Sequence, residues 1–222
     1  TPVVREDWKR NYEIITAMDA WAGELIAQLK ADGLYENTII FFWSDHGVGL
    51  PRAKRWLYDS GTRIPLIVCQ PGGRAGVSDR LVSSIDFGPT ALKLAGLKIP
   101  NHMQGRSFIG GLPRKFVFGA RDRMDERYDI IRSVRDRRFR YIRNYEPLKT
   151  YYQYMNTPEK GATMKEIRGV HAAGKMVLAA ALFMAPRKPV EELYDLEADP
   201  HEINNLVAKK KHEAKLKELR EA

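Results

Sequence analysis

The chain has 222 residues, 44% of them hydrophobic and 10% aromatic, and its 37 lysines and arginines exceed its 28 acids by nine charges. These values are typical of a globular protein with one large domain or two small ones, and the basic balance suits an anionic partner or simply a basic surface. The single cysteine, Cys69, excludes an internal disulfide framework, and no apolar run is long enough to span a membrane.

A long helix and two strands are predicted for the first part of the chain. Apolar side chains recur at helical spacing over residues 5–30, and Gly33 follows as a residue suited to ending a helix. The β-branched and aromatic run 38–43 predicts a buried strand, and the apolar run 64–69 predicts a second one. Helix, loop and strands in this order favour an α/β unit.

Charged and metal-ligating residues follow the first predicted strand. Asp45 and His46 come directly after it, and Lys54 lies in the basic loop before the second strand, between Arg52 and Arg55. In open α/β sheets, ligands bind beyond the carboxyl ends of the strands. A carboxylate beside an imidazole suits a metal and a lysine suits an anion, so we expect a metal-assisted site for an anionic substrate.

The second part of the chain differs in character. Glycine and proline cluster between residues 105 and 113, and we place a boundary there that separates residues 1–112 from residues 113–222. The predicted elements are a helix at 89–95, strands at 116–120, 130–135, 139–144 and 193–196, a helical stretch within 162–184, and a charged helix at 206–221.

Five phrases of the sequence occur in an order that resembles one known family. They are GLYENTIIFFWSDHG, GTRIPLIV, SSIDFGPTALKLAG, MQGRS and ELYDLEADPHEINNL. Together they resemble the sulfatase family of the alkaline-phosphatase superfamily, in particular bacterial glycan sulfatases and heparan N-sulfatase-like members. The resemblance implies an α/β fold, with part of an alkaline-phosphatase-like sandwich over residues 1–112. It also implies a small α+β subdomain over residues 113–222, with a four-stranded antiparallel sheet and a C-terminal helix.

The resemblance also assigns roles to individual residues. It implies that Asp45 and His46 ligate a divalent metal, with Ca²⁺ preferred and Mg²⁺ or another divalent ion as alternatives, since a histidine ligand leaves the identity open. Lys54 would be the catalytic cation that binds the sulfate, with Arg52 and Arg55 as competitors. Three further residues are candidates for substrate binding: His102, for which an exposed loop position is the preferred interpretation, and Arg121 and Arg123.

The nucleophile of the family is not found in these residues. Sulfatases carry a formylglycine made from a Cys or Ser in a Cys-x-Pro-x-Arg motif, and after Cys69 the arginine comes one place too late, at Arg74. We therefore expect the chain to be the C-terminal part of a protein that hydrolyses sulfate esters or sulfamates, with formylglycine in a missing N-terminal half. By itself the chain should be inactive, and it should associate with that half or with itself. The resemblance implies a periplasmic or secreted parent that acts on a sulfated carbohydrate.

Two alternatives stay open from the sequence. A phosphonate or phosphodiester hydrolase of the same superfamily would use the same metal chemistry. A non-catalytic polyanion- or nucleic-acid-binding fragment is a different class, because nine arginines fall within residues 121–143. We expect no nucleic-acid partner, since no recognised motif is present and the apolar–arginine alternation suits a sheet with one solvated face.

Overall fold

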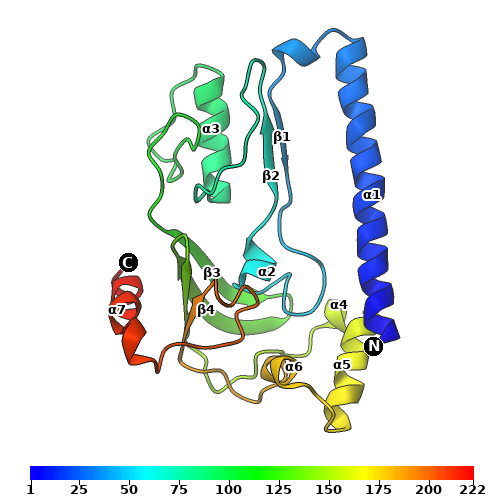
Figure 1. Cartoon of the computed structure of the whole chain (residues 1–222), viewed down its shortest axis with the longest axis vertical. Helices are drawn as coiled ribbons and strands as arrows, with labels where there is room; N and C mark the ends of the chain where they lie inside the picture. Colours follow the sequence, from blue (N-terminus) through cyan, green and yellow to red (C-terminus); the bar gives the residue numbers. More distant parts are fainter. The chain divides into compact units, whose positions relative to one another are not determined.

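The computed structural model describes residues 1–222, apart from the side chain of Leu178. The chain forms two compact units, each drawn from three separate segments (Figure 1). The first unit comprises Thr1–Gly76, Arg123–Tyr128 and Leu148–Lys188, and the second comprises Val77–Asp122, Asp129–Pro147 and Pro189–Ala222. The division at residue 112 concerns the domains of a longer protein, and it stays a prediction.

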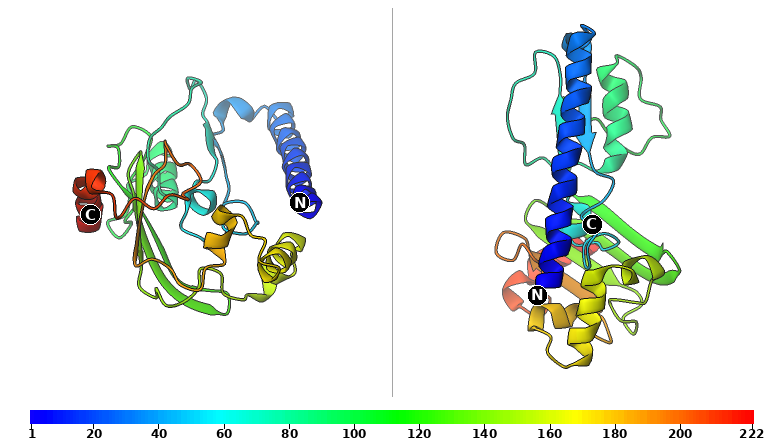
Figure 2. Two further views of the ribbon diagram at one scale, coloured as in Figure 1. Left: turned by 60° about the horizontal axis from the view of Figure 1, so that its bottom comes forward. Right: turned by 90° about the vertical axis from the view of Figure 1, so that its right-hand side faces the viewer.

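The helix expected at the start of the chain is confirmed. Helix α1 (Pro2–Ala31) begins with a proline in its first turn, where the missing N–H costs no hydrogen bond, and Gly33 follows its end with a φ of 68°. Its first turns lie beside α5 (Ala162–Ala172), as Figure 2 shows, where Thr163 donates from its backbone N and its Oγ1 to Asp7. No described residue of α1 is buried, and no described helix of the chain is long and apolar enough to cross a membrane.

The two predicted strands exist, but the expectation that they are buried is wrong. Strands β1 (Ile40–Trp43) and β2 (Leu66–Cys69) pair with each other antiparallel. Trp43 is 49% exposed and Ile67 is 61% exposed. A sheet of two strands shields little apolar surface, so an apolar run does not become a buried strand without further strands or helices around it.

The rest of the first unit packs around aromatic side chains. It contains η1 (Tyr35–Asn37), α2 (Asp59–Thr62), α4 (Asn156–Glu159), α5 and α6 (Leu178–Phe183). The helical stretch predicted within 162–184 is therefore two helices. Trp56, from the basic loop, meets Phe183 edge to face with ring centroids 5.6 Å apart, and Tyr152 lies 5.3 Å from the same ring. This cluster anchors the loop between β1 and β2.

The second unit is built on the four-stranded antiparallel sheet that was predicted. Its strands are β3 (Val117–Met124), β4 (Arg127–Arg135), β5 (Phe139–Asn144) and β6 (Glu191–Asp195), in that spatial order, and the tip of the β3–β4 hairpin belongs to the first unit. The remaining elements are η2 (Ser84–Asp86), α3 (Phe87–Leu94), η3 (Lys210–His212) and α7 (Glu213–Glu221).

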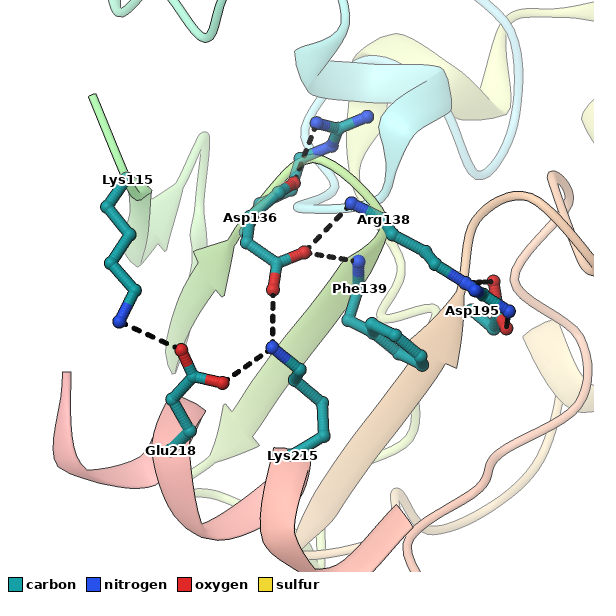
Figure 3. A network of polar contacts seen from close by, with 8 residues as sticks. Lys115, Asp136, Arg138, Phe139, Asp195, Lys215 and Glu218 are labelled. Carbon is teal, nitrogen blue, oxygen red and sulfur yellow. Dashed lines mark hydrogen bonds and ion pairs between the residues drawn. The ribbon is translucent and has the colours of Figure 1, made fainter. Parts of the chain in front are cut away.

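The C-terminal helix covers one face of this sheet, as expected. Leu216 and Leu219 of α7 are buried against Tyr141 and Leu193. Polar contacts hold the helix in place (Figure 3): Lys215 donates to Asp136 in the β4–β5 turn at 3.0 Å and also binds Glu218. Glu218 in turn accepts from Lys115 at 3.0 Å, so a further ion pair ties α7 to the segment before β3.

The expectation of a solvated opposite face is wrong. Arg140, Ile142 and Asn144, which alternate with the residues facing α7, are all buried. Arg140 forms an ion pair of 3.0 Å with the buried Glu202, and Asn144 donates to Glu192 at 2.6 Å. A buried guanidinium is tolerated when a carboxylate accompanies it, which the local apolar–arginine alternation does not reveal.

Candidate functional site

The loop after β1 is held in shape by close backbone contacts. Gly47 N donates to Gly61 O at 3.0 Å, and a Cβ placed on Gly47 would collide with the carbonyl oxygen of Ser60. A Cβ on Gly61 would collide with the carbonyl oxygens of Ala53 and Trp56. Two parts of the loop can approach this closely only because glycine stands at both positions.

Asp45 and His46 form a pair of donors at the start of this loop. The Nδ1 atom of His46 lies 2.8 Å from Gly47 O, and since a carbonyl oxygen only accepts, Nδ1 carries a hydrogen. The other ring nitrogen, Nε2, lies 3.4 Å from Oδ2 of the exposed Asp45. A ring whose other nitrogen is fixed by a backbone carbonyl is the usual arrangement of a metal-ligating histidine.

The pair fits two ligands of a metal site rather than a whole one. A carboxylate oxygen and an imidazole nitrogen on neighbouring residues are suitable donors for a divalent ion. In the part of the chain that the structure describes, no group of three or more His, Cys, Asp or Glu side chains could hold a metal. Further ligands would have to come from elsewhere.

Of the three cations in the loop, Lys54 is the one whose charge is left available. The Arg52 guanidinium lies 3.8 Å from the centre of the Tyr58 ring, and Arg55 Nε donates to Asp125 Oδ2 at 2.7 Å. Within the described residues, Lys54 makes no side-chain ion pair. Its backbone is fixed all the same, because Lys54 N donates to Val48 O at 3.0 Å.

The backbone around Lys54 is unusual as well. Arg52 and Arg55 both adopt the left-handed region, with φ values of 62° and 82°. Non-glycine residues keep such conformations only when their surroundings impose them, and they concentrate at functional sites. The buried neighbours Ala53 and Trp56 provide that restraint here.

Arg123 is linked to the same loop through a residue that the sequence did not point to. Asp125, in the β3–β4 turn of the first unit, accepts from Arg55 through its carboxylate and from Arg123 Nε through its backbone oxygen at 3.1 Å. Arg123 is otherwise exposed, as a ligand-binding arginine must be. Only a long-range contact identifies Asp125, so no local sequence signal could have found it.

The other two candidates for substrate binding, His102 and Arg121, belong to the second unit. His102 is exposed in a turn closed by a 3.0 Å hydrogen bond from Met103 N to Pro100 O. Arg121 lies on strand β3 and is only 3% exposed. Its burial favours a role in packing over contact with a ligand.

Two of the five sequence phrases, SSIDFGPTALKLAG and MQGRS, contain residues that bind the buried side chain of Asp86. Asp86 accepts from Ser83 N and Arg106 N, and both its oxygens bind Arg114. Burial would raise the pKa of Asp86, but the Arg114 hydrogen bond, followed by those from the Arg106 and Ser83 backbone, holds that pKa below its ordinary value. Thr90 adds a second bridge, since its Oγ1 donates to Asp86 O and accepts from Phe108 N. These residues are structural.

The C-terminal phrase is structural too. Asp199 accepts from the backbone N atoms of Ile203 and Asn204, which closes the turn that presents Glu202 to Arg140. Asn205 Oδ1 accepts from Leu193 N, so the chain continues along β6. This pairing explains why α7 starts later than the helix predicted at 206–221.

Comparison with known proteins gives consistent matches. Residues 9–97 match the family model described as Sulfatase. The chain is 43% identical over 225 residues to an ulvan-active sulfatase of Formosa agariphila, covering 99% of this chain and 38% of that protein. It is 28% identical over 241 residues to the N-sulphoglucosamine sulphohydrolase of Homo sapiens, covering 100% of this chain and 47% of that protein.

Solved structures agree with these sequence matches. The chain superposes with a TM-score of 0.62 and 25% identity on a protein solved in complex with its substrate D-glucosamine-2-N,6-O-disulfate, covering 93% of this chain and 37% of that one. The predicted fold class, a mixed α/β architecture of the alkaline-phosphatase-like type with antiparallel sheets and a C-terminal helix, is confirmed. The chain spans between about a third and a half of the length of the relatives it matches.

Proposed function

Because the chain belongs to the sulfatase family, we propose that it forms part of an enzyme that removes sulfate groups from carbohydrates. One observation carries the proposal. On a single anchored loop, Lys54 keeps its charge available within the described part of the chain, while Asp45 and His46 present two metal donors. A cation on the same loop as two potential metal ligands suits a compact anion such as a sulfate group.

Asp45 and His46 would hold a divalent metal together with ligands from outside these residues. Ca²⁺ is our first choice, since it prefers carboxylate oxygen, and Mg²⁺ or another divalent ion is the alternative. Such a metal supplies positive charge that offsets the negative charge on the reacting oxygens. The contact between His46 Nδ1 and Gly47 O would keep the His46 ring oriented before the metal binds.

Lys54 would contact a sulfate oxygen directly. Its backbone is held by Val48 and by buried neighbours, so the ammonium is carried on a rigid base. A fixed cation stabilises charge that grows during the reaction without the cost of reorienting solvent. Arg55 and Arg52 would instead support the loop through Asp125 and Tyr58.

The remaining parts of the enzyme would lie outside this chain. We propose that a formylglycine from another segment supplies the nucleophilic oxygen, because no Cys-x-Pro-x-Arg motif occurs in the 222 residues. The exposed apolar side chains of α1, such as Ile14 and Trp21, and the exposed parts of the β1–β2 sheet would pack against that segment or a second copy. Residues 1–112 would then complete the large α/β domain, with residues 113–222 as the C-terminal subdomain.

The relatives support the substrate class that we propose. One of them is active on ulvan, and another protein was solved with a sulfated glucosamine, so we propose a sulfated carbohydrate carrying sulfate esters or sulfamates. Arg123 and His102 are the candidates for contact with the sugar, and Arg121 is not retained because it is buried. A periplasmic or secreted location of the parent protein is part of the same proposal.

The test compares lysine variants in the full-length parent protein. Lys54→Ala should lower kcat/KM for a sulfated oligosaccharide by about a hundredfold or more, and Lys54→Arg should recover part of the loss. Lys98→Ala, at an exposed lysine of the second unit, is the matched control and should leave the kinetics unchanged. Wild-type kcat/KM in Lys54→Ala would overturn the role. Faster turnover of an aryl phosphodiester than of an aryl sulfate by the parent would favour the phosphoester alternative.

The metal assignment has its own readout. The double variant Asp45→Asn, His46→Gln should lower the amount of divalent metal that copurifies with the folded parent protein, as measured by mass spectrometry. Unchanged metal content in the double variant would show that these two residues are not ligands.

A further inference from the structure

A concave site lies within the second unit, between the sheet and α7. Its volume is about 620 Å³, which is within the range of about 300–1,000 Å³ common to small-molecule sites. Strands β4, β5 and β6 form one wall and α7 forms the other. The side chains that matter for its chemistry are Arg132, Tyr141, Arg143, Tyr145, Glu191 and Arg220.

Two arginines of this pocket stand directly opposite each other. In the register of the sheet, Arg132 of β4 pairs with Arg143 of β5, and Arg143 pairs with Glu191 of β6. The three side chains therefore form one row on the face that α7 covers. Like charges in directly opposed positions destabilise a sheet, so this row favours the binding of a compensating anion.

Glu191 compensates the charge of Arg143 only in part, because its oxygens are also bound by Arg220 and Tyr141. Arg220 binds both of them at 2.7 and 2.6 Å, and the Tyr141 hydroxyl donates to Oε1 at 2.6 Å. Arg143 approaches the same carboxylate only to 3.3 Å. Its guanidinium therefore keeps donors that can face the pocket.

Arg132 forms an ion pair with a partner that is exposed to solvent. Its NH2 group binds Asp122 at 2.6 Å, and that aspartate is largely exposed to solvent, which weakens the pair. Three guanidinium groups at this site thus face two carboxylates, one of which is solvated. The pocket keeps an excess of positive charge.

An aromatic ring stands next to the cations. Tyr145 follows β5, its backbone N is fixed by a 2.9 Å hydrogen bond to Ile130 O, and its side chain is 57% exposed. The Arg143 guanidinium lies 5.7 Å from the centre of its ring. An exposed ring beside a guanidinium offers an apolar face and ionic donors together, which suits a sugar ring that carries an acidic group.

We propose that this pocket binds a sulfate or carboxylate group of an acidic saccharide between Arg132 and Arg143, with the sugar ring against Tyr145. The anion site stands on the geometry of the second unit alone. The choice of a saccharide as the carrier of the anion rests on the proposed function.

Binding is the primary test, because it can be read even if no sulfate is hydrolysed. Isothermal titration of the purified protein with a sulfated tetrasaccharide should give an affinity that Arg143→Gln and Tyr145→Ala each weaken by about tenfold. Arg137→Gln is the matched control, since Arg137 is exposed on the same unit and pairs with Asp79 at 2.6 Å away from the pocket. It should change the affinity by less than about twofold.

Folding and turnover are measured beside binding. Arg143→Gln should change the melting temperature little, because the like-charge pair that it removes offsets the loss of the 3.3 Å contact with Glu191. It should leave kcat/KM for a small aryl sulfate unchanged. A purely structural arginine would instead lower the melting temperature. If the wild-type parent shows no aryl sulfate turnover at all, that result counts against the proposed function and not against this site.

Three results would overturn the inference. The first is equal affinity of the wild type and Arg143→Gln for the sulfated tetrasaccharide. The second is equal affinity of the wild type for the tetrasaccharide and its desulfated counterpart. The third is tighter binding of single-stranded DNA with the same loss in Arg143→Gln, which would assign the pocket to nucleic acid.

Discussion

Arg55 Nε donates a 2.7 Å hydrogen bond to Asp125 Oδ2, and this contact joins the loop that carries Lys54 to the turn between β3 and β4. The Arg55 side chain is only 12% exposed, so the pair is shielded from solvent more than most ion pairs. Through it, a turn far along the chain determines the conformation of the proposed sulfate-binding loop.

Asp125→Asn is therefore expected to weaken both folding and substrate binding. Loss of a charge-assisted hydrogen bond to a half-buried arginine should lower the free energy of unfolding by about 1–2 kcal/mol and raise KM for the sulfated substrate. Asp79→Asn is the matched control, because the Asp79–Arg137 pair has a 2.6 Å contact but is largely exposed on both sides. In urea denaturation, that control should lower the free energy of unfolding by less than about 0.5 kcal/mol. Equal losses of unfolding free energy in both variants would contradict the expectation.

Gly47→Ala tests whether the close backbone approach shapes the site. The added Cβ would collide with Ser60 O, so the loop must shift, and overpacking of this kind costs about 1–3 kcal/mol. Metal content and kcat/KM of the parent should fall together with the melting temperature. Gly49→Ala is the control in the same loop, since no atom lies within 4 Å of a Cβ there. The same behaviour in both variants would mean that the approach of Gly47 to Ser60 does not matter.

Local periodicity was enough to predict much of the fold. The apolar spacing over residues 5–30 and the alternation on both sides of Asp136 gave α1 and the β4–β5 hairpin with small errors at their ends. The burial of Arg140 could not be predicted in this way, because it depends on Glu202, which reaches the sheet from a distant turn. An arginine in an alternating strand is a solvated residue or a buried ion pair according to partners that the local pattern does not contain.

The site was predictable only in outline. Sequence position alone could not separate Lys54 from Arg52 and Arg55, because the three cations stand within a few residues of each other. The structure separates them by their contacts, since Tyr58 and Asp125 engage the two arginines. Arg121 and Arg123 looked equivalent in sequence, because residues two apart share one face of a strand. The structure buries Arg121 and exposes Arg123, which lies next to the tip of the β3–β4 hairpin, and the strand pattern does not contain that difference.

The 222-residue chain by itself is expected to show no turnover of an aryl sulfate. Under the proposed function Asp45, His46 and Lys54 would provide metal and sulfate contacts, but the family's nucleophile motif does not occur among the 222 residues. Addition of a separately produced N-terminal segment that carries formylglycine should restore activity, and the same segment with its modified residue replaced by alanine should not. Measurable hydrolysis by the purified chain alone would refute the assignment of the nucleophile to another segment.

The pH dependence of stability should report the contact between Glu191 and Arg220. The Arg220 hydrogen bond, opposed by burial and aided by Tyr141, lowers the pKa of Glu191 to about 2 from an ordinary value of 4.5. A depressed carboxyl pKa adds stability above the unfolded value and loses it as the pH falls through the folded value. Between pH 4.5 and pH 2 the wild type should therefore lose roughly 1–2 kcal/mol more than Arg220→Gln. Arg137→Gln is the control for a general change in net charge, and denaturation curves at several pH values that run parallel for the wild type and Arg220→Gln would show that this pair does not anchor α7 to β6.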